Sequence, residues 1–434
     1  MGRAGFAKTS ITPPLGVELA GYGVYLQRRA TEVHDDLFAR ALLLEGDIGD
    51  RVLLLALDLI GLSWELDREI AAQAGAAAGL AADRVLISCT HTHNGPATLP
   101  MEGWGEIDPC YVERLPALCA SAAAEAVAAL HPVRIGTGQT TVRALGFNRV
   151  RPDGPIDRGL HVVRIDGIDG TPEVVVFSHG CHPVSIDRRT SAGTAISADW
   201  PGQVARRLGE AGYGEALFRL GLCGDIDPIV AWRNFTFEGT ELSAALVEES
   251  LLELLRSVEP VPTLRLGLAR QEVELSLTPL GDDHIAAVRK EMPRPQGSVR
   301  VMDPGAEATA WPRFYGAWVE AMRAQMATQP ERLSVPLAAF LINDTAWLHL
   351  PGEVFTALGR AIMERSPFSE TVVTTLFGPF IGYLPDRDDF AAGGYAATLV
   401  PRILQLPPYS PAVGDALISG AVALLESLEN RGGM

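Results

Sequence analysis

One strand–helix–strand order constrains the fold of this chain more than any other feature. Residues 51–61, RVLLLALDLIG, form a continuous apolar run of strand length. Residues 65–80 are rich in alanine and predict a helix, and residues 84–90, RVLISCT, predict a second buried strand. Strands that are apolar throughout are typical of a sheet covered on both faces. We therefore expect an α/β fold in which mixed β-sheets are flanked by α-helices.

The rest of the chain continues this alternation. Further helices are expected at 112–130, 197–210 and 241–258, and further strands at 133–142, 160–166, 173–180 and 263–277. The second half then repeats the pattern with a hairpin over 336–350, a helix from Glu353 to about Glu364, and a strand over 370–378. We expect one catalytic domain that spans residues 1–434.

Residues 280–335 differ from their surroundings. They are more charged and are interrupted by proline and glycine, with a helical pattern around 315–328. The segment still contains large apolar side chains that need to be buried, namely Trp311, Phe314, Trp318 and Met322. We therefore expect a helical insertion or lid within the domain rather than a linker.

Composition and charge exclude several classes of protein. With 434 residues, 47% of them hydrophobic, the chain has ample material for a buried core. Its formal net charge of -17 repels phosphate backbones, so nucleic acid is not an expected partner. We expect no transmembrane segment, because the sequence contains no run of 18 apolar residues. The expected location is the cytoplasm, or outside the cell if a signal peptide was removed, and nothing in the sequence determines the oligomeric state.

Common catalytic signatures are absent from the sequence. It contains no Walker A motif, no HExxH zinc motif and no G-x-S-x-G nucleophile elbow, and GTGQTT at 136–141 lacks the third glycine of a dinucleotide fingerprint. The five cysteines show no CxxC spacing, which disfavours a disulfide framework or a cysteine-rich zinc site. We expect buried thiols, so the chemistry has to come from other residues.

Four of the nine histidines follow two expected strands. His91 and His93 lie in THTHNGP, and His179 and His182 lie in FSHGCHP. Open α/β sheets build their sites at strand ends, and a catalytic zinc needs about three nitrogen or oxygen ligands and an open position. The alternative interpretation is a pair of hydrogen-bonded strand ends. Spacing does not decide between His179 and His182 as a ligand.

Several carboxylates are candidates for the same site. Asp225 and Asp227 lie in the glycine-rich segment GLCGDIDPI, where an Asx-type turn is the favoured interpretation for Asp227. Glu353 begins an expected helix, where the helix dipole alone favours a carboxylate. Asp58, Asp199 and Asp225 are candidates for orienting ligand histidines, with helix or turn capping as the alternative.

The chain resembles the N-terminal catalytic domain of the neutral/alkaline, non-lysosomal ceramidase family, which are zinc-dependent amidases that cleave the N-acyl bond of ceramide. The resemblance extends over most of the sequence and rests on an ordered set of motifs. They are GFAKTSITPPLGVELAGYG, HDDLFARALLLE, THTHNGP, NRV, HP, GDIDP, PGEVFTALG, and GY followed by a later tyrosine. Each motif alone has little specificity, but the order of the set is specific.

The resemblance implies a zinc ion (Zn2+) and a set of site residues. The implied ligands are the first histidine of THTH, the histidine before proline, the glutamate after PG and the tyrosine of GY, which are His91, His182, Glu353 and Tyr383. It also places His93, Arg149 and Tyr395 in the site. The hypothesis is that His93 shuttles a proton, while Arg149 and Tyr395 stabilise the oxyanion during hydrolysis of a lipid-like or other small N-acyl substrate.

One departure from the family concerns the nucleophile. The serine that the family carries just before the Gly-Asp-x-x-Pro turn is missing, because RLGLCGDIDP contains no serine. We also expect no C-terminal immunoglobulin-like domain of the family, since the sequence given ends at residue 434. We therefore expect metal-activated water to attack the amide. Cys223 is a less favoured nucleophile, since most buried cysteines are inert. The alternative functions are an esterase or deacylase of a small non-lipid metabolite and a non-catalytic zinc-binding scaffold.

Overall fold

The strand–helix–strand order expected near residue 60 occurs three times in the computed structural model, which describes residues 1–291 and 304–432. In each unit the two strands are parallel neighbours in one sheet, joined through the helix. The units are β4 (Arg51–Leu57), α1 (Trp64–Ala78) and β5 (Val85–Cys89); β9 (Pro172–His179), α3 (Asp199–Glu210) and β11 (Glu215–Leu220); and β15 (Thr345–His349), α7 (Thr356–Arg365) and β17 (Glu370–Thr374).

Two sheets contain these units. The larger sheet has the order β11-β9-β8-β6-β1-β3-β4-β5, and the smaller has the order β13-β14-β15-β17. Their other strands are β1 (Arg3–Ser10), β3 (Phe38–Glu45), β6 (His131–Thr141), β8 (Gly159–Gly167), β13 (Leu266–Ser276) and β14 (Arg332–Ile342). Short pairs also form between β2 (Glu32–Val33) and β10 (Ala195–Ile196), between β7 (Gly146–Asn148) and β12 (Ile226–Pro228), and between β16 (Glu353–Val354) and β18 (Tyr383–Leu384).

Helices cover one face of each sheet. Four helices pack on the larger sheet: α1, α3, α2 (Pro109–Ala128) and α4 (Phe237–Ser257). Their apolar residues form one cluster with that sheet. Helices α7 and α11 (Val413–Gly432) pack on the smaller sheet. In the described part of the chain, no helix combines the length and the apolar character that a membrane span requires.

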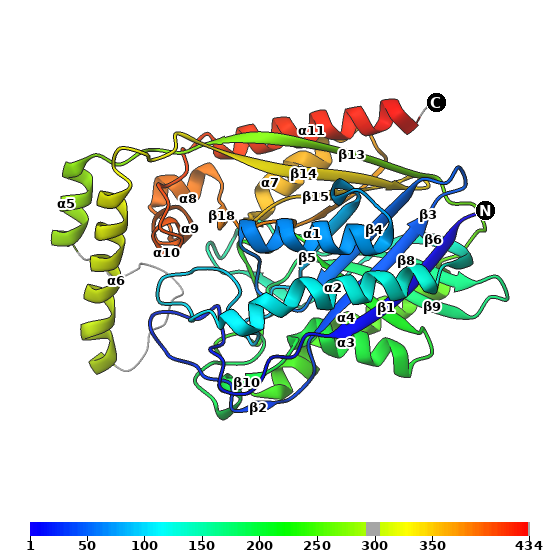
Figure 1. Ribbon diagram of the computed structural model, residues 1–434, viewed down its shortest axis with the longest axis horizontal. Coiled ribbons are helices and arrows are strands. Elements are labelled where there is room, and N and C mark those ends of the chain that lie inside the picture. Colours follow the sequence, from blue (N-terminus) through cyan, green and yellow to red (C-terminus); the bar gives the residue numbers. More distant parts are fainter. Residues whose placement is uncertain (292–303, 433–434) are drawn as a thin grey trace.

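The other faces of the two sheets pack against each other, because alternate residues of a strand point to opposite sides. In β4, Leu54 belongs to the apolar cluster between the sheets, together with Phe340 and Trp347 of the smaller sheet. Its neighbour Leu55 belongs to the cluster beneath the helices. The result is four layers in the order helix, sheet, sheet, helix (Figure 1). This confirms the expected α/β fold of mixed sheets flanked by helices.

The larger sheet is curled, so that its two edge strands β5 and β11 come together. Arg219 of β11 is buried and donates hydrogen bonds to the Ser88 hydroxyl and the Leu86 carbonyl of β5. The segment that follows β17 lies in the same seam, because Thr375 donates its backbone N–H to β11 and Gly378 donates its own to β5. The ends of strands from both sheets therefore meet in one place.

Between the neighbouring strands β13 and β14 the chain contains α5 (Asp282–Glu291) and α6 (Pro304–Ala324). These helices lie within the region 280–335 that was expected to be an insertion or lid, of which residues 292–303 lie outside the described residues. The two helices stand at one end of the molecule (Figure 1). Beside them lie α8 (Arg387–Ala392), α9 (Tyr395–Thr398) and α10 (Val400–Ile403).

The helices of this region bury the large side chains that the sequence contains there. Trp318 and Met322 pack against Ile285 of α5 in a small cluster of their own. Phe314 is buried against Trp104, in the loop before α2, with 5.5 Å between the ring centroids. The region thus contacts the rest of the domain through aromatic rings. Its movement as a lid stays a prediction.

Glu353 is not at the start of a helix, so the helix-dipole interpretation of this residue is wrong. Helix α7 begins at Thr356, and Glu353 lies in β16, in register with Tyr383 of β18. The preceding Gly352 has a φ of 64°, a left-handed conformation that glycine adopts readily, and it turns the chain into this pairing. The backbone N–H of Glu353 donates to the carbonyl of Gly382.

Two adjacent leucines test the four-layer packing. Leu54 and Leu55 are both fully buried, but on opposite faces of β4. We expect either Leu54→Ala or Leu55→Ala to lower the free energy of unfolding by about 2–5 kcal/mol. Ile48, which is 87% exposed before β4, is the control, and Ile48→Ala should change it by less than about 0.5 kcal/mol. Urea denaturation followed by tryptophan fluorescence measures all three, and a loss confined to one leucine would contradict the packing.

Candidate metal centre

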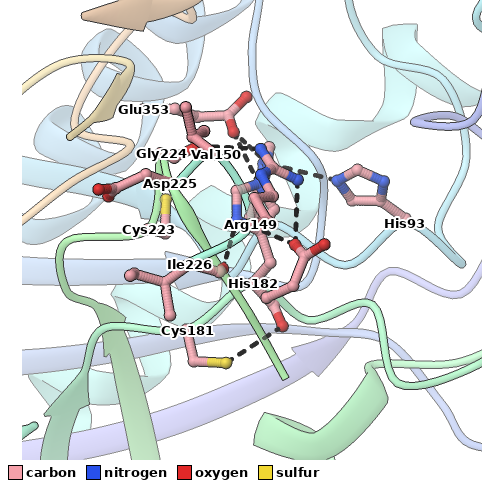
Figure 2. A network of polar contacts seen from close by, with 12 residues as sticks. His93, Arg149, Val150, Cys181, His182, Cys223, Gly224, Asp225, Ile226 and Glu353 are labelled. Atoms are coloured by element: carbon pink, nitrogen blue, oxygen red, sulfur yellow. Dashed lines mark hydrogen bonds and ion pairs between the residues drawn. The ribbon is translucent and has the colours of Figure 1, made fainter. Parts of the chain in front are cut away.

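Segments far apart in the sequence meet where the strands of the curled sheet end. His91 follows β5, His182 follows β9, and Glu353 and Tyr383 lie side by side in β16 and β18. All four side chains are buried. Figure 2 shows the Glu353 carboxylate and the His93 ring pointing into the same cluster of side chains from two sides. The structure therefore brings the four expected ligands together.

The polar atoms of this cluster lie at the distances expected between ligands of one metal ion. Glu353 Oε2 is 2.7 Å from His182 Nε2 and 3.3 Å from His91 Nε2. The Tyr383 hydroxyl is 3.4 Å from His182 Nε2, and His93 Nε2 is 3.3 Å from His91 Nε2. Zinc binds nitrogen and oxygen at about 2.0–2.1 Å, so tetrahedral ligand atoms lie about 3.3 Å apart. Three of the four distances are close to this spacing, and the distance between Glu353 Oε2 and His182 Nε2 is shorter.

Hydrogen bonds of the second ring nitrogen orient the two ligand histidines. His91 Nδ1 lies 2.6 Å from the carbonyl of Ile60, and His182 Nδ1 lies 3.0 Å from the carbonyl of Ile226. A carbonyl only accepts, so each Nδ1 carries a proton, and each ring turns its Nε2 toward Glu353. A lone pair and a carboxylate oxygen 2.7 Å apart repel each other unless a proton or a metal ion lies between them.

The surroundings favour a metal ion over a proton in that position. Burial lowers the pKa of His182, and the nearby Arg149 guanidinium lowers it further. Burial also holds the pKa of His93 well below its ordinary value. Burial alone would raise the pKa of Glu353, but His91 and His182 outweigh that effect and hold it well below the usual carboxyl range. The lowered pKa values of His182 and Glu353 favour a neutral imidazole and an ionised carboxylate, which are the forms that bind zinc, so these residues fit this ion.

Arg149 holds Tyr383 at the edge of the cluster. Its guanidinium donates hydrogen bonds to the Tyr383 hydroxyl at 2.7 Å, to the Gly224 carbonyl at 3.0 Å and to Asp227 Oδ1 at 3.0 Å. Burial would lower the pKa of Arg149, but Asp227, Tyr383, Glu353 and Tyr395 together outweigh burial and raise it well above its ordinary value. Arg149 is therefore a fixed cation beside the centre. Tyr395 lies next to it, with its ring centroid 5.8 Å from that of Tyr383.

Asp227 belongs to the site, although the sequence analysis favoured a turn residue. That interpretation is wrong, because Asp227 lies in β12 and pairs with β7. Its buried carboxylate accepts hydrogen bonds from Arg149 at 3.0 Å and from the Trp232 indole N–H at 2.9 Å. Pro228 is the signal that could have identified the strand, since the residue before a proline favours an extended backbone.

The three aspartates considered as orienting groups bond elsewhere, and backbone carbonyls orient the ligand histidines instead. Asp58, Asp199 and Asp225 fix local structure around the site. Asp58 pairs with Arg40 and the Phe38 N–H; Asp199 accepts from the N–H groups of Ser185 and Trp200; and Asp225 accepts from Asn148 and Thr356. Asp199 and Asp225 accept backbone N–H groups at the starts of α3 and α7, which agrees with the capping alternative, whereas the contacts of Asp58 with Arg40 and Phe38 fit neither interpretation.

His179 and Cys223 differ in their relation to the centre. His179 Nδ1 bonds to the Gly159 carbonyl at 2.8 Å, so of the two histidines that spacing left open, only His182 reaches the cluster. Cys223 Sγ lies within 4.8 Å of ligand atoms of His182 and Glu353. Burial raises the pKa of the Cys223 thiol well above its ordinary value, which keeps the thiol protonated and a poor nucleophile. All five cysteines are free, as expected, but Cys110 is exposed, so the expectation of buried thiols is wrong for this residue.

Comparisons with known proteins place the fold. No family model matches the chain, and no curated protein matches it. The crystal structure of neutral ceramidase from Pseudomonas aeruginosa matches with a TM-score of 0.75 and 17% identity, over 99% of this chain and 75% of that chain. A ceramidase complexed with C2 matches with a TM-score of 0.73 and 17% identity, over 99% and 75% of the two chains. The chain therefore has the neutral ceramidase fold along almost its whole length, as the sequence resemblance predicted.

Proposed function

We propose that this protein is a zinc-dependent hydrolase that cleaves an amide (N-acyl) bond. The observation that carries the proposal is the approach of His182 Nε2 to Glu353 Oε2, at 2.7 Å. A zinc ion held by these two residues together with His91 and Tyr383 would remove the repulsion between them, and the site would keep a position for water or substrate. The fold shared with neutral ceramidases supports amide hydrolysis as the reaction class.

The residues around the centre have separate roles in this proposal. Zinc in this position would polarise the amide carbonyl and lower the pKa of a water molecule to about 7, so no protein nucleophile is needed. His93 lies 3.3 Å from His91, and its buried Nδ1 has no hydrogen-bond partner among the described residues. It is placed to accept a proton and pass it to the leaving amine. Arg149 and Tyr395 stabilise the charge that develops on the carbonyl oxygen.

Removal of the metal distinguishes a zinc-dependent hydrolase from a non-catalytic zinc-binding scaffold. We expect the purified protein to hydrolyse N-acyl amides, to lose at least nine-tenths of that rate in excess chelator, and to regain it when zinc is added back, because the ion supplies the polarisation of the carbonyl. Matching esters in the same assay report an esterase. If zinc raised the thermal midpoint of the protein while every amide and ester stayed intact, the scaffold interpretation would replace this one.

Removal of one ligand tests the centre itself. We expect His182→Ala to weaken zinc binding by about 100-fold or more, because losing a ligand costs more than losing an outer partner, and to reduce the rate with it. His179→Ala is the matched control, since His179 is buried at the end of the same strand and bonds to Gly159. Metal analysis after dialysis and hydrolysis rates are the measurements. A folded His182→Ala protein with full zinc and full rate would exclude the assignment.

A conservative change at Arg149 tests its role in stabilising charge. Lysine keeps the positive charge but cannot make the three hydrogen bonds that Arg149 makes, so we expect Arg149→Lys to lower kcat by about 100-fold with zinc content unchanged. Arg151→Lys is the control, because Arg151 pairs with Asp386 and Asp388 near the surface. Equal kcat values for the two variants would remove Arg149 from the mechanism.

A further inference from the structure

Arg28 is a buried arginine near the centre, and every N–H of its guanidinium group has an acceptor. Its Nε donates to the Gly193 carbonyl at 2.9 Å, and its Nη1 donates to the carbonyls of Ala20 at 3.0 Å and His93 at 3.1 Å. Its Nη2 donates to the carbonyls of His93 at 3.1 Å and Gly193 at 2.7 Å. A guanidinium group has five N–H donors, so these bonds use all of them.

The three carbonyls belong to three separate segments around the centre. Ala20 lies between β1 and β2, His93 follows β5, and Gly193 lies in the short 3₁₀ helix Ser191–Thr194. A planar group with donors on three sides can bind all three carbonyls at once. A lysine ammonium has the same charge but only three donors at one point, so it cannot replace the arginine. Arg28 therefore connects these segments through their main chains.

The segment that carries Arg28 also forms the wall beside the His93 ring. Gly21 has a φ of 92°, and a Cβ atom there would lie 2.5 Å from His93 Nδ1, so only glycine leaves room for the ring. The Tyr22 ring contacts the His93 ring with 5.1 Å between the centroids. The Arg28 guanidinium lies over the same Tyr22 ring, at 4.6 Å from its centroid. Arg28 thus supports His93 both through its carbonyl and through this wall.

His93 needs such support because its ring has no anchor of the kind that the ligand histidines have. Carbonyl groups bind the Nδ1 atoms of His91 and His182. The buried Nδ1 of His93 has no hydrogen-bond partner among the described residues, and its Nε2 lies 3.3 Å from His91 Nε2. The position of the ring beside the centre therefore depends on the main chain that carries it and on the wall that it contacts.

Arg28 is close to the space for a substrate, but it has no donor left for one. It lines a cavity of about 590 Å³, which shares Met101, Ile403 and Leu404 with the small cavity at the centre. All five of its N–H groups are bonded to the protein itself. Arg28 is therefore suited to hold other residues in place rather than to bind the substrate.

We propose that Arg28 is a positioning residue that holds His93 where it can transfer a proton, an inference that rests on the hydrolase function proposed above. In that reaction the oxygen of water bonds to the acyl carbon and the C–N bond breaks. His93 carries a proton from this water to the nitrogen of the leaving amine. A displacement of about 1 Å can cost a reaction about 100-fold in rate, so loss of the support should lower kcat.

Arg28→Lys tests this role, because lysine keeps the charge and loses the planar fork. For an N-acyl amide, we expect kcat to fall by about 10- to 100-fold, with KM changed by less than about twofold and zinc content unchanged. Arg29→Lys is the matched control, since the neighbouring Arg29 side chain is 60% exposed and pairs with Glu18, and its kcat should stay at the wild-type value. Thermal midpoints check that both variants fold.

A combination with His93→Ala distinguishes positioning of His93 from a general support of the fold. If Arg28 acts through His93, Arg28→Lys has nothing left to disturb once the His93 ring is absent. We expect His93→Ala alone to lower kcat by about 100-fold or more, and the double variant to have the same kcat within about twofold. If the two effects multiplied, Arg28 would act on the site in another way. That result would overturn the inference and leave the hydrolase function in place.

Tyr22→Leu covers the case in which Arg28→Lys does not fold. It removes the ring that contacts both the guanidinium and His93, and it keeps the hydrogen bonds of Arg28. We expect kcat to fall by about tenfold, and to fall no further when the change is added to His93→Ala. In that case a Tyr22→Leu protein with the full rate, or effects that multiply, would overturn the inference. A wild-type protein that hydrolysed no amide or ester would remove both the hydrolase function and this role of Arg28.

Discussion

The close approach of an ionised carboxylate to two imidazole rings is the constraint on which the rest of the structure depends. Glu353, His182 and His91 are all buried, and the Nε2 atoms of both rings lie within 3.3 Å of Glu353 Oε2. Such an arrangement is costly without a cation, because an unpaired buried charge loses its hydration and receives nothing in return. The neighbouring groups keep the arrangement in place, since backbone carbonyls fix both rings and Arg149 fixes the tyrosine. The site is thus built for a positive ion at its middle.

The four-layer fold holds segments that are distant in the sequence at the short distances that the site requires. Loops alone would have to lose conformational entropy to bring residues 91, 182 and 353 together. Here each follows a strand whose two faces are packed, and the curl of the larger sheet, closed by Arg219 and the segment after β17, places the ends of those strands side by side. Rigid elements position metal ligands better than free loops do. The same apolar strands that define the fold therefore also define the geometry of the centre.

The fold and the centre differ in how far the sequence predicts them. Apolar strands and alanine-rich helices were evident because their periodicity is local, and the order β4, α1, β5 follows from residues 51–89 alone. Spacing could not choose between His179 and His182, since both lie near the end of the buried strand β9 and only their contacts with distant segments decide which one faces the centre. Asp227 was interpreted as a turn residue for the same reason. Its role depends on Arg149, which lies 78 positions away, and no local pattern encodes such a contact.

Trp104 has a consequence for how a protein of this kind can change. Trp104 lines two small cavities beside the metal centre. It also packs against Phe314 and Trp311 of α6. The helices between β13 and β14 thus support a wall of the space beside the centre, and none of their described residues belongs to the cluster of candidate ligands. Exchange of that one segment would reshape the space for the substrate while the ion and its partners stayed as they are. The residues that would hold the ion and the residues that shape the space beside it therefore lie in different segments of the chain. Substitutions in the second group can change that space while the ligands stay unchanged.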